Sequence, residues 1–157
     1  MIDQKKRTSF IRHLLSDINA LEWMIANDKI ENDVVRIGAE QEFCLVTDSW
    51  RPSKSSQEIL KVIDDNHFTT ELAKYNLEIN LDPEELKGNC FTTVQNQLTE
   101  LLTKAEHAAK KHNNNVILTG ILPTIGKNEL GMDYLTPRSR YQNINSINSS
   151  LNMVIGK

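Results

Sequence analysis

The sequence predicts an α+β fold, in which helices pack on one face of a mostly antiparallel sheet and the other face is open and acidic. Apolar residues recur every three or four positions in two long segments, as in amphipathic helices. Apolar and polar residues alternate strictly over residues 75–81, as in a strand with one solvated face. Glu40 and Glu42 stand two apart in another apolar segment, so both carboxylates point to one face of a strand. A buried parallel strand would instead be apolar throughout.

The first half of the chain provides a helix, a strand and a second helix. The long helix is expected over residues 8–27, because its apolar residues share one face: Phe10, Ile11, Leu14, Leu15, Ile18, Leu21, Met24 and Ile25. Thr8 or Ser9 is expected to be its N-cap. An apolar run predicts a strand over 34–47, and a turn with Pro52 follows. A short helix is then expected over 56–65, with Ile59, Leu60 and Ile63 on one face.

The second half provides a strand, a helix and a last strand. Residues 75–81 form the alternating strand, which Asp82 and Pro83 end. The helix over 91–112 has its apolar residues on one face: Phe91, Val94, Leu98, Leu101, Leu102, Ala105, Ala108 and Ala109. Residues 116–122 are a short apolar run of strand length, interrupted by Gly120. The polar tail is rich in Asn and Ser and has few apolar anchors, so its sequence assures no helix.

Length and composition are those of one globular domain. The chain has 157 residues, of which 39% are hydrophobic and 25% charged. We expect a single domain over 1–157, with an N-terminal helix in 1–30, a sheet-and-helix core in 34–125 and the tail in 126–157. The net charge of −3 provides no basic field for nucleic acid. No apolar run is long enough to span a membrane and no secretory signal is present, so we expect no membrane partner and a cytoplasmic location.

The open face gathers carboxylates that could bind a metal. Glu40 and Glu42 share one strand, Glu78 lies on the polar face of another, and Glu71 stands seven residues before Glu78. Like charges in one site raise one another's pKa, whereas a hard divalent cation removes the repulsion. Mg²⁺ takes oxygen ligands and is usually held by a few carboxylates together with substrate phosphates. The face therefore suggests a platform for Mg²⁺ and nucleotide phosphate, although glutamates two apart are also common on a solvated sheet face.

Five features in order resemble the glutamate–cysteine ligase family and its carboxylate–amine ligase relatives. Residues 38–43, GAEQEF, resemble the G-x-E-x-E strand that opens the family, and the small residues before Glu40 suggest a close approach to the backbone. Residues 69–80, TTELAKYNLEIN, resemble its second acidic strand, and the helix over 91–112 stands where the family has one. Residues 119–124, TGILPT, resemble its G-x-x-P stretch, and residues 137–141, PRSRY, resemble its R-Y element.

This resemblance implies a glutamine-synthetase-like fold and an ATP- and Mg²⁺-dependent ligase. ATP would phosphorylate the γ-carboxylate of glutamate, and the amine of cysteine would attack the acyl phosphate, a step of glutathione biosynthesis. The implied metal ligands are Glu40, Glu42, Glu71 and Glu78. Arg140, or Arg138 in its place, would bind a substrate carboxylate or phosphate, since a guanidinium pairs bidentately with both.

The chain departs from the family in two ways. Leu122 stands before Pro123 where many relatives have a histidine, and family members are much longer. We therefore expect this to be the N-terminal part of a longer ligase, inactive alone unless another chain supplies the rest.

Two other functions fit the same pattern. One is a non-catalytic α+β module that binds another protein or a second copy through an exposed sheet edge, and a homodimer is compatible with either function. The other keeps the ligase chemistry but uses a different amine as acceptor.

Overall fold

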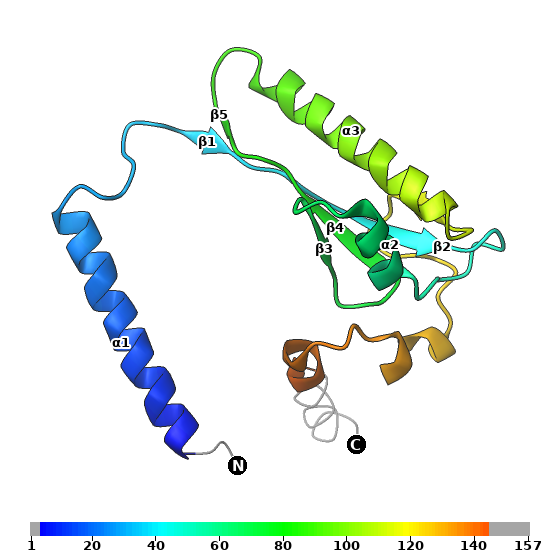
Figure 1. The fold of residues 1–157 in the computed structure, drawn as a ribbon, viewed down its shortest axis with the longest axis horizontal. Helices are drawn as coiled ribbons and strands as arrows, with labels where there is room; N and C mark the ends of the chain where they lie inside the picture. Colours follow the sequence, from blue (N-terminus) through cyan, green and yellow to red (C-terminus); the bar gives the residue numbers. More distant parts are fainter. Residues whose placement is uncertain (1–3, 145–157) are drawn as a thin grey trace. The chain divides into compact units, whose positions relative to one another are not determined.

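The computed structural model describes residues 4–144 and divides the chain into two units, residues 1–35 and 36–157 (Figure 1). Residues 4–35 contain one regular element, helix α1 (Gln4–Ala26), and none of its residues is buried. The predicted helix is confirmed, but it begins earlier, so the N-cap prediction is wrong. Thr8 lies inside the helix, where its hydroxyl donates to the Gln4 carbonyl at 3.0 Å. Within the described residues, no helix is long and apolar enough to cross a membrane.

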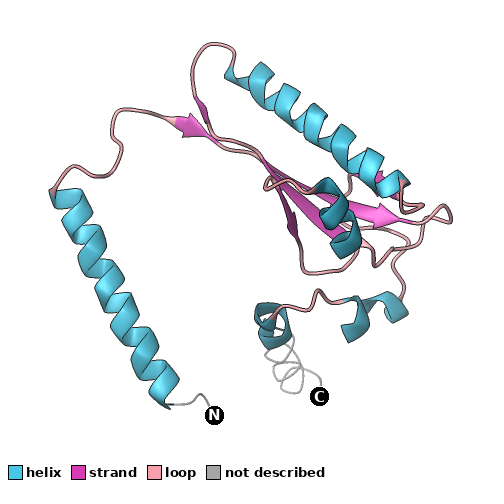
Figure 2. Ribbon diagram, viewed as in Figure 1, coloured by secondary structure: helices cyan, strands magenta, loops and turns pink. Residues whose placement is uncertain are grey.

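The second unit is built on a four-stranded antiparallel sheet in the order β3-β4-β2-β6 (Figure 2). The central strands are β2 (Glu40–Val46) and β4 (Asn76–Asn80), and the edge strands are β3 (Phe68–Thr70) and β6 (Asn115–Ile117). A separate two-stranded ribbon pairs β1 (Arg36–Ile37) with β5 (Glu84–Glu85). The α+β class with an antiparallel sheet is thus confirmed. The predicted strand 34–47 is two strands, because the chain passes from the ribbon to the sheet between residues 37 and 40.

Two helices pack on one face of this sheet, α2 (Ser56–Ile63) and α3 (Cys90–Lys110). Alternate residues of β2 and β4 point toward them, so Phe43, Leu45, Leu77 and Ile79 are fully buried. The helices contribute a further set to the same core: Ile59, Ile63, Leu101, Ala105, Ala108 and Ala109. The alanines let α3 approach the sheet closely. Asp64 ends α2 in the left-handed conformation, with φ of 46°.

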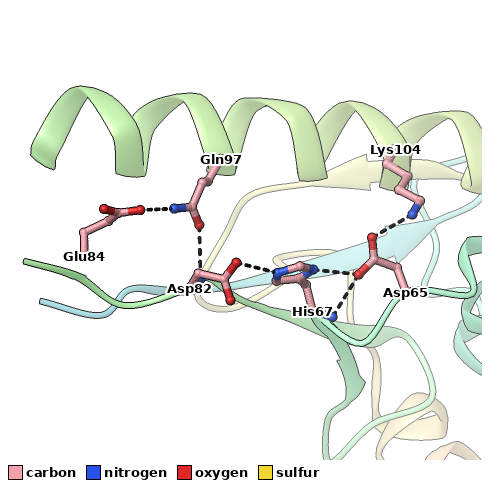
Figure 3. A network of polar contacts seen from close by, with 6 residues as sticks. All are labelled: Asp65, His67, Asp82, Glu84, Gln97 and Lys104. Carbon is pink, nitrogen blue, oxygen red and sulfur yellow. Dashed lines mark hydrogen bonds and ion pairs between the residues drawn. The ribbon is translucent and has the colours of Figure 1, made fainter.

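A polar network also connects α3 to the sheet (Figure 3). Lys104 on α3 donates to an Asp65 carboxylate oxygen at 2.6 Å. The two ring nitrogens of His67 contact Asp65 at 2.7 Å and Asp82 at 3.3 Å, and the backbone N–H of Asp82 donates to the Gln97 side chain on α3. The network therefore joins three segments: the loop before β3, the end of β4 and two turns of α3.

Among residues 4–144, the other face of the sheet is covered only at one end. Cys44 and Val46 of β2 pack against Leu122, which is 3% exposed, and form a small second cluster. The chain turns onto this face after Ile117, so β6 is shorter than the predicted strand 116–122. Two short 3₁₀ helices follow, η1 (Lys127–Leu130) and η2 (Met132–Tyr134). Beyond the cluster, the polar side chains of this face are Glu40 and Glu42 of β2 and Glu78 and Asn80 of β4.

Candidate metal centre

Glu42 and Glu78 stand directly opposite each other on the central strands β2 and β4. Their neighbours Phe43, Leu77 and Ile79 point into the core beneath the helices. Because side chains alternate along a strand, both glutamates must point to the opposite, open face. Directly opposite residues of an antiparallel pair have Cβ atoms about 4.5–5.5 Å apart, and like charges there destabilise the sheet. The register that buries the core therefore forces two carboxylates together.

Glu71 supplies a third carboxylate from the loop that follows edge strand β3. Its Oε2 accepts a hydrogen bond from the backbone N–H of Leu72 at 3.0 Å. Its own carbonyl accepts a hydrogen bond from the Thr136 hydroxyl at 2.6 Å, and the Thr136 N–H donates to the Leu72 carbonyl at 2.9 Å. Thr136 is buried. The segment after η2 thus fixes the loop that carries Glu71.

The three carboxylates form one compact acidic group. One oxygen from each of Glu42, Glu71 and Glu78 lies within 4.8 Å of the others. Glu42 is exposed, whereas Glu71 and Glu78 are half-buried. Burial raises the pKa of Glu71, and so do a hydrogen bond with Glu78 and the charges of Glu42 and Glu78. Without a cation, Glu71 is therefore protonated more readily than an isolated carboxyl group.

Polar side chains surround this group on the same face. The Asn80 amide donates to Glu78 Oε1 at 2.7 Å, which fixes the orientation of that carboxylate. Asn76 lies opposite Cys44, whose Sγ is 3.9 Å from its Oδ1. Burial and the charge of Glu42 raise the pKa of the Cys44 thiol, which disfavours a thiolate there. The alternation of residues 75–81 places Asn76 and Asn80 on the polar face, but it assigns them no role.

The remaining predicted site residues lie outside the acidic group. Glu40 is exposed, two residues before Glu42 on the same face of β2, and lies opposite Asn80. The exposed Arg140 guanidinium lies over the Tyr141 ring, 5.2 Å from its centroid, and Arg138 is also exposed. Tyr141 is buried, and its hydroxyl donates to the Thr70 carbonyl at 3.5 Å. The arginine segment is thereby held beside the strand that leads into Glu71.

The donor set suits a hard divalent cation. Three carboxylates offer only oxygen, which is the ligand type of Mg²⁺ and Ca²⁺, and they include neither a thiolate nor an imidazole. A divalent charge would also offset the carboxylate charges that help to raise the pKa of Glu71. Mg²⁺ keeps several waters and usually takes only a few carboxylates, so a half-exposed group of three is sufficient. The residues present therefore fit a metal site.

A comparison of the chain with protein-family models, with curated proteins and with solved structures found no match.

Proposed function

We propose that Glu42, Glu71 and Glu78 bind Mg²⁺, and that the bound ion holds the phosphates of ATP for a carboxylate–amine ligase. The observation that carries this proposal is the approach of three carboxylate oxygens within 4.8 Å, with the pKa of Glu71 raised by burial and by its neighbours. Such a group is electrostatically unfavourable when all three carboxylates are charged, and a divalent cation makes it favourable.

The resemblance of residues 34–142 to glutamate–cysteine ligases supplies the reaction. An oxygen of the glutamate γ-carboxylate attacks the γ-phosphorus of ATP, and ADP leaves. The amine of cysteine, or of another acceptor, then attacks the acyl carbon; the C–O bond to phosphate breaks and the amine loses a proton. A bound divalent cation would neutralise the charge that develops on the phosphate oxygens.

The protein's own residues position this chemistry. The core beneath β2 and β4 fixes Glu42 and Glu78, Asn80 orients Glu78, and Thr136 holds the loop of Glu71. Glu40, two residues before Glu42 on the same face of β2, is assigned to the same metal platform. Arg140, or Arg138 in its place, would pair with a substrate carboxylate or phosphate.

A second candidate function rests on the free edge of strand β6. Within the part of the chain that the structure describes, this strand pairs with β2 on one side only, and Leu118 and Ile121 beyond it are 53% and 84% exposed. An edge of this kind can pair with another chain. A non-catalytic module that associates through this edge would need neither Mg²⁺ nor ATP, so dependence on these two ligands separates the two functions.

Thermal unfolding tests the proposed function. A ligand that binds only the folded chain stabilises it by about 1.4 kcal/mol when present at ten times its Kd. We expect Mg²⁺ with a non-hydrolysable ATP analogue to raise the melting temperature of the parent chain, more than either ligand alone. The rise should disappear in a Glu42→Gln, Glu78→Gln double variant.

The matched control removes two carboxylates elsewhere. Glu100 and Glu106 are exposed on α3, so Glu100→Gln, Glu106→Gln makes the same change in net charge away from the acidic group. This control should keep the full rise. An equal loss of the rise in both double variants would refer the effect to net charge alone. A full rise in both would place the binding site elsewhere, and no rise in the parent would refute nucleotide binding by this face.

A further inference from the structure

Helix α1 carries an apolar stripe that its own unit does not cover. Residues 4–35 contain no second helix or strand, and no residue of α1 is buried. Helices in water derive most of their stability from packing an amphipathic face against another element. A stripe along a helix of 23 residues therefore requires something to pack against it.

The stripe has the spacing of a helix–helix seam. Isoleucine and leucine alternate at intervals of three and four residues, at Ile11, Leu14, Ile18, Leu21 and Ile25. Each of these side chains is between 44% and 60% exposed. Over residues 11–25 isoleucine occupies each a position and leucine each d position. In parallel coiled coils this combination favours two strands, so the seam indicates a pair of helices and their orientation depends on the charges. Phe10, Leu15 and Met24 widen the seam at the flanking e and g positions.

From this seam we infer that α1 pairs with α1 of a second copy of the chain, in antiparallel orientation. The charges of the helix decide which partner packs against the seam and in which orientation. Its cations all lie near the start, at Lys5, Lys6, Arg7 and Arg12, whereas its carboxylates, Asp17 and Glu22, lie in the second half. An antiparallel pair places the basic end of each helix beside the acidic half of the other.

A parallel pair would oppose like charges. It would bring the basic ends of both copies together. It would also set Asp17, at a g position, against Glu22 of the second copy at the following e position. The antiparallel pair instead brings Phe10 near Met24 of the second copy at both ends, and its one like-charge contact is between Asp17 and Asp17 of the second copy at the centre. Opposed helix dipoles add to the same preference.

The first experiment measures the mass of the full chain in solution by sedimentation over a range of concentrations. We expect a reversible dimer of twice the 17.9 kDa chain mass. Ile18→Glu, at the centre of the seam, should halve the mass, and Ser16→Glu, which adds the same charge on the opposite side of the helix, should leave the dimer intact. Circular dichroism establishes that both variants keep the sheet unit folded.

Either of two results would overturn the proposal. One is a monomer at every concentration, which would assign the seam to another surface of the same chain or to a different protein. The other is a dimer that Ile18→Glu does not weaken, which would place the interface elsewhere, for example at the edge of β6.

The second experiment measures orientation. Cys44 and Cys90 are buried, so a spin label can be directed to a Gln4→Cys variant. With a rise of 1.5 Å per residue, antiparallel helices should separate the two labels by about 30 Å or more. A parallel pair would place them about 10 Å apart, and a distance that short would refute the antiparallel arrangement.

Discussion

The two faces of the four-stranded sheet are made by the same strands, but one is stabilised by apolar packing and the other is destabilised by repulsion between like charges. On β4, Leu77 is fully buried beneath the helices, and the next residue, Glu78, joins two other carboxylates on the open face. One face is stabilised by apolar contacts in a single cluster. The other concentrates like charges, which costs stability unless a proton or a cation is bound. The comparison shows that the core fixes a strand register which an acidic face alone would disfavour.

The largest expected effect on stability comes from the sheet face that packs against α2 and α3. Leu77→Ala should lower the free energy of unfolding by about 2–5 kcal/mol, because it leaves a cavity among Phe43, Ile59 and other core residues. Glu78→Gln, one position along the strand, should raise stability slightly in metal-free buffer, since it removes one of three repelling charges. Chemical denaturation of both variants measures the difference, and a similar loss in both would contradict the division between the faces.

The next largest effect lies in the polar network that joins α3 to the sheet. Asp65→Asn weakens its contacts with Lys104 and with the His67 ring, so we expect a loss of about 1–2 kcal/mol. Lys111, exposed at the end of α3, provides a comparison, and Lys111→Gln should change stability little. Equal effects of the two substitutions, measured by denaturant unfolding, would show that the network does not hold α3.

His67 should make that network sensitive to pH. Hydrogen bonds and charges from Asp65 and Asp82 raise the pKa of His67 above its ordinary value of 6.5. Its contribution to stability is therefore complete below pH 6.5 and is lost as the pH rises through the raised pKa. Replacing His67 by Gln should cost stability at pH 6 and less at pH 9. A cost that does not vary with pH would contradict the ionic role.

Glu71 should give a smaller effect of pH on the open face. Its pKa is raised above the ordinary value of 4.5, so the proton on Glu71 stabilises the fold below pH 4.5, and this stability is lost as the pH rises through the raised pKa. In metal-free buffer, the parent should lose stability over this range relative to Glu71→Gln, and Mg²⁺ should restore it. The test is the difference between the two unfolding curves across pH, which would stay flat if Glu71 titrated normally.

Local sequence patterns predicted the elements whose structure depends mainly on neighbouring residues. The alternation of residues 75–81 predicted β4, and the spacing of Glu40 and Glu42 placed them on one face. The break between β1 and β2 was missed, because the apolar run 34–47 gives no sign that the chain changes partner strands. Strand β3 and the ribbon strand β5 were not predicted either, since three and two residues are too short to show a period.

The candidate site depended more on distant contacts. Three of the four predicted ligands meet in the acidic group, because strand register brings Glu42 and Glu78 together. The position of Glu71 depends on Thr136, which lies 65 residues away in the chain, so no local pattern could assign it. The role of Asn80 depends on a side-chain orientation that alternation alone does not specify. Arg140 is held beside β3 by Tyr141, and its part in substrate binding stays a prediction.

The most direct test of the central claim uses Mn²⁺ as a paramagnetic substitute for Mg²⁺. Electron paramagnetic resonance of free Mn²⁺, titrated with the chain, measures the bound fraction without requiring turnover. We expect the parent to bind Mn²⁺ competitively with Mg²⁺, Glu78→Gln to lose most of this binding, and the exposed control Glu100→Gln to retain it. Binding that is absent in the parent, or equal in all three chains, would contradict a metal site on the open face.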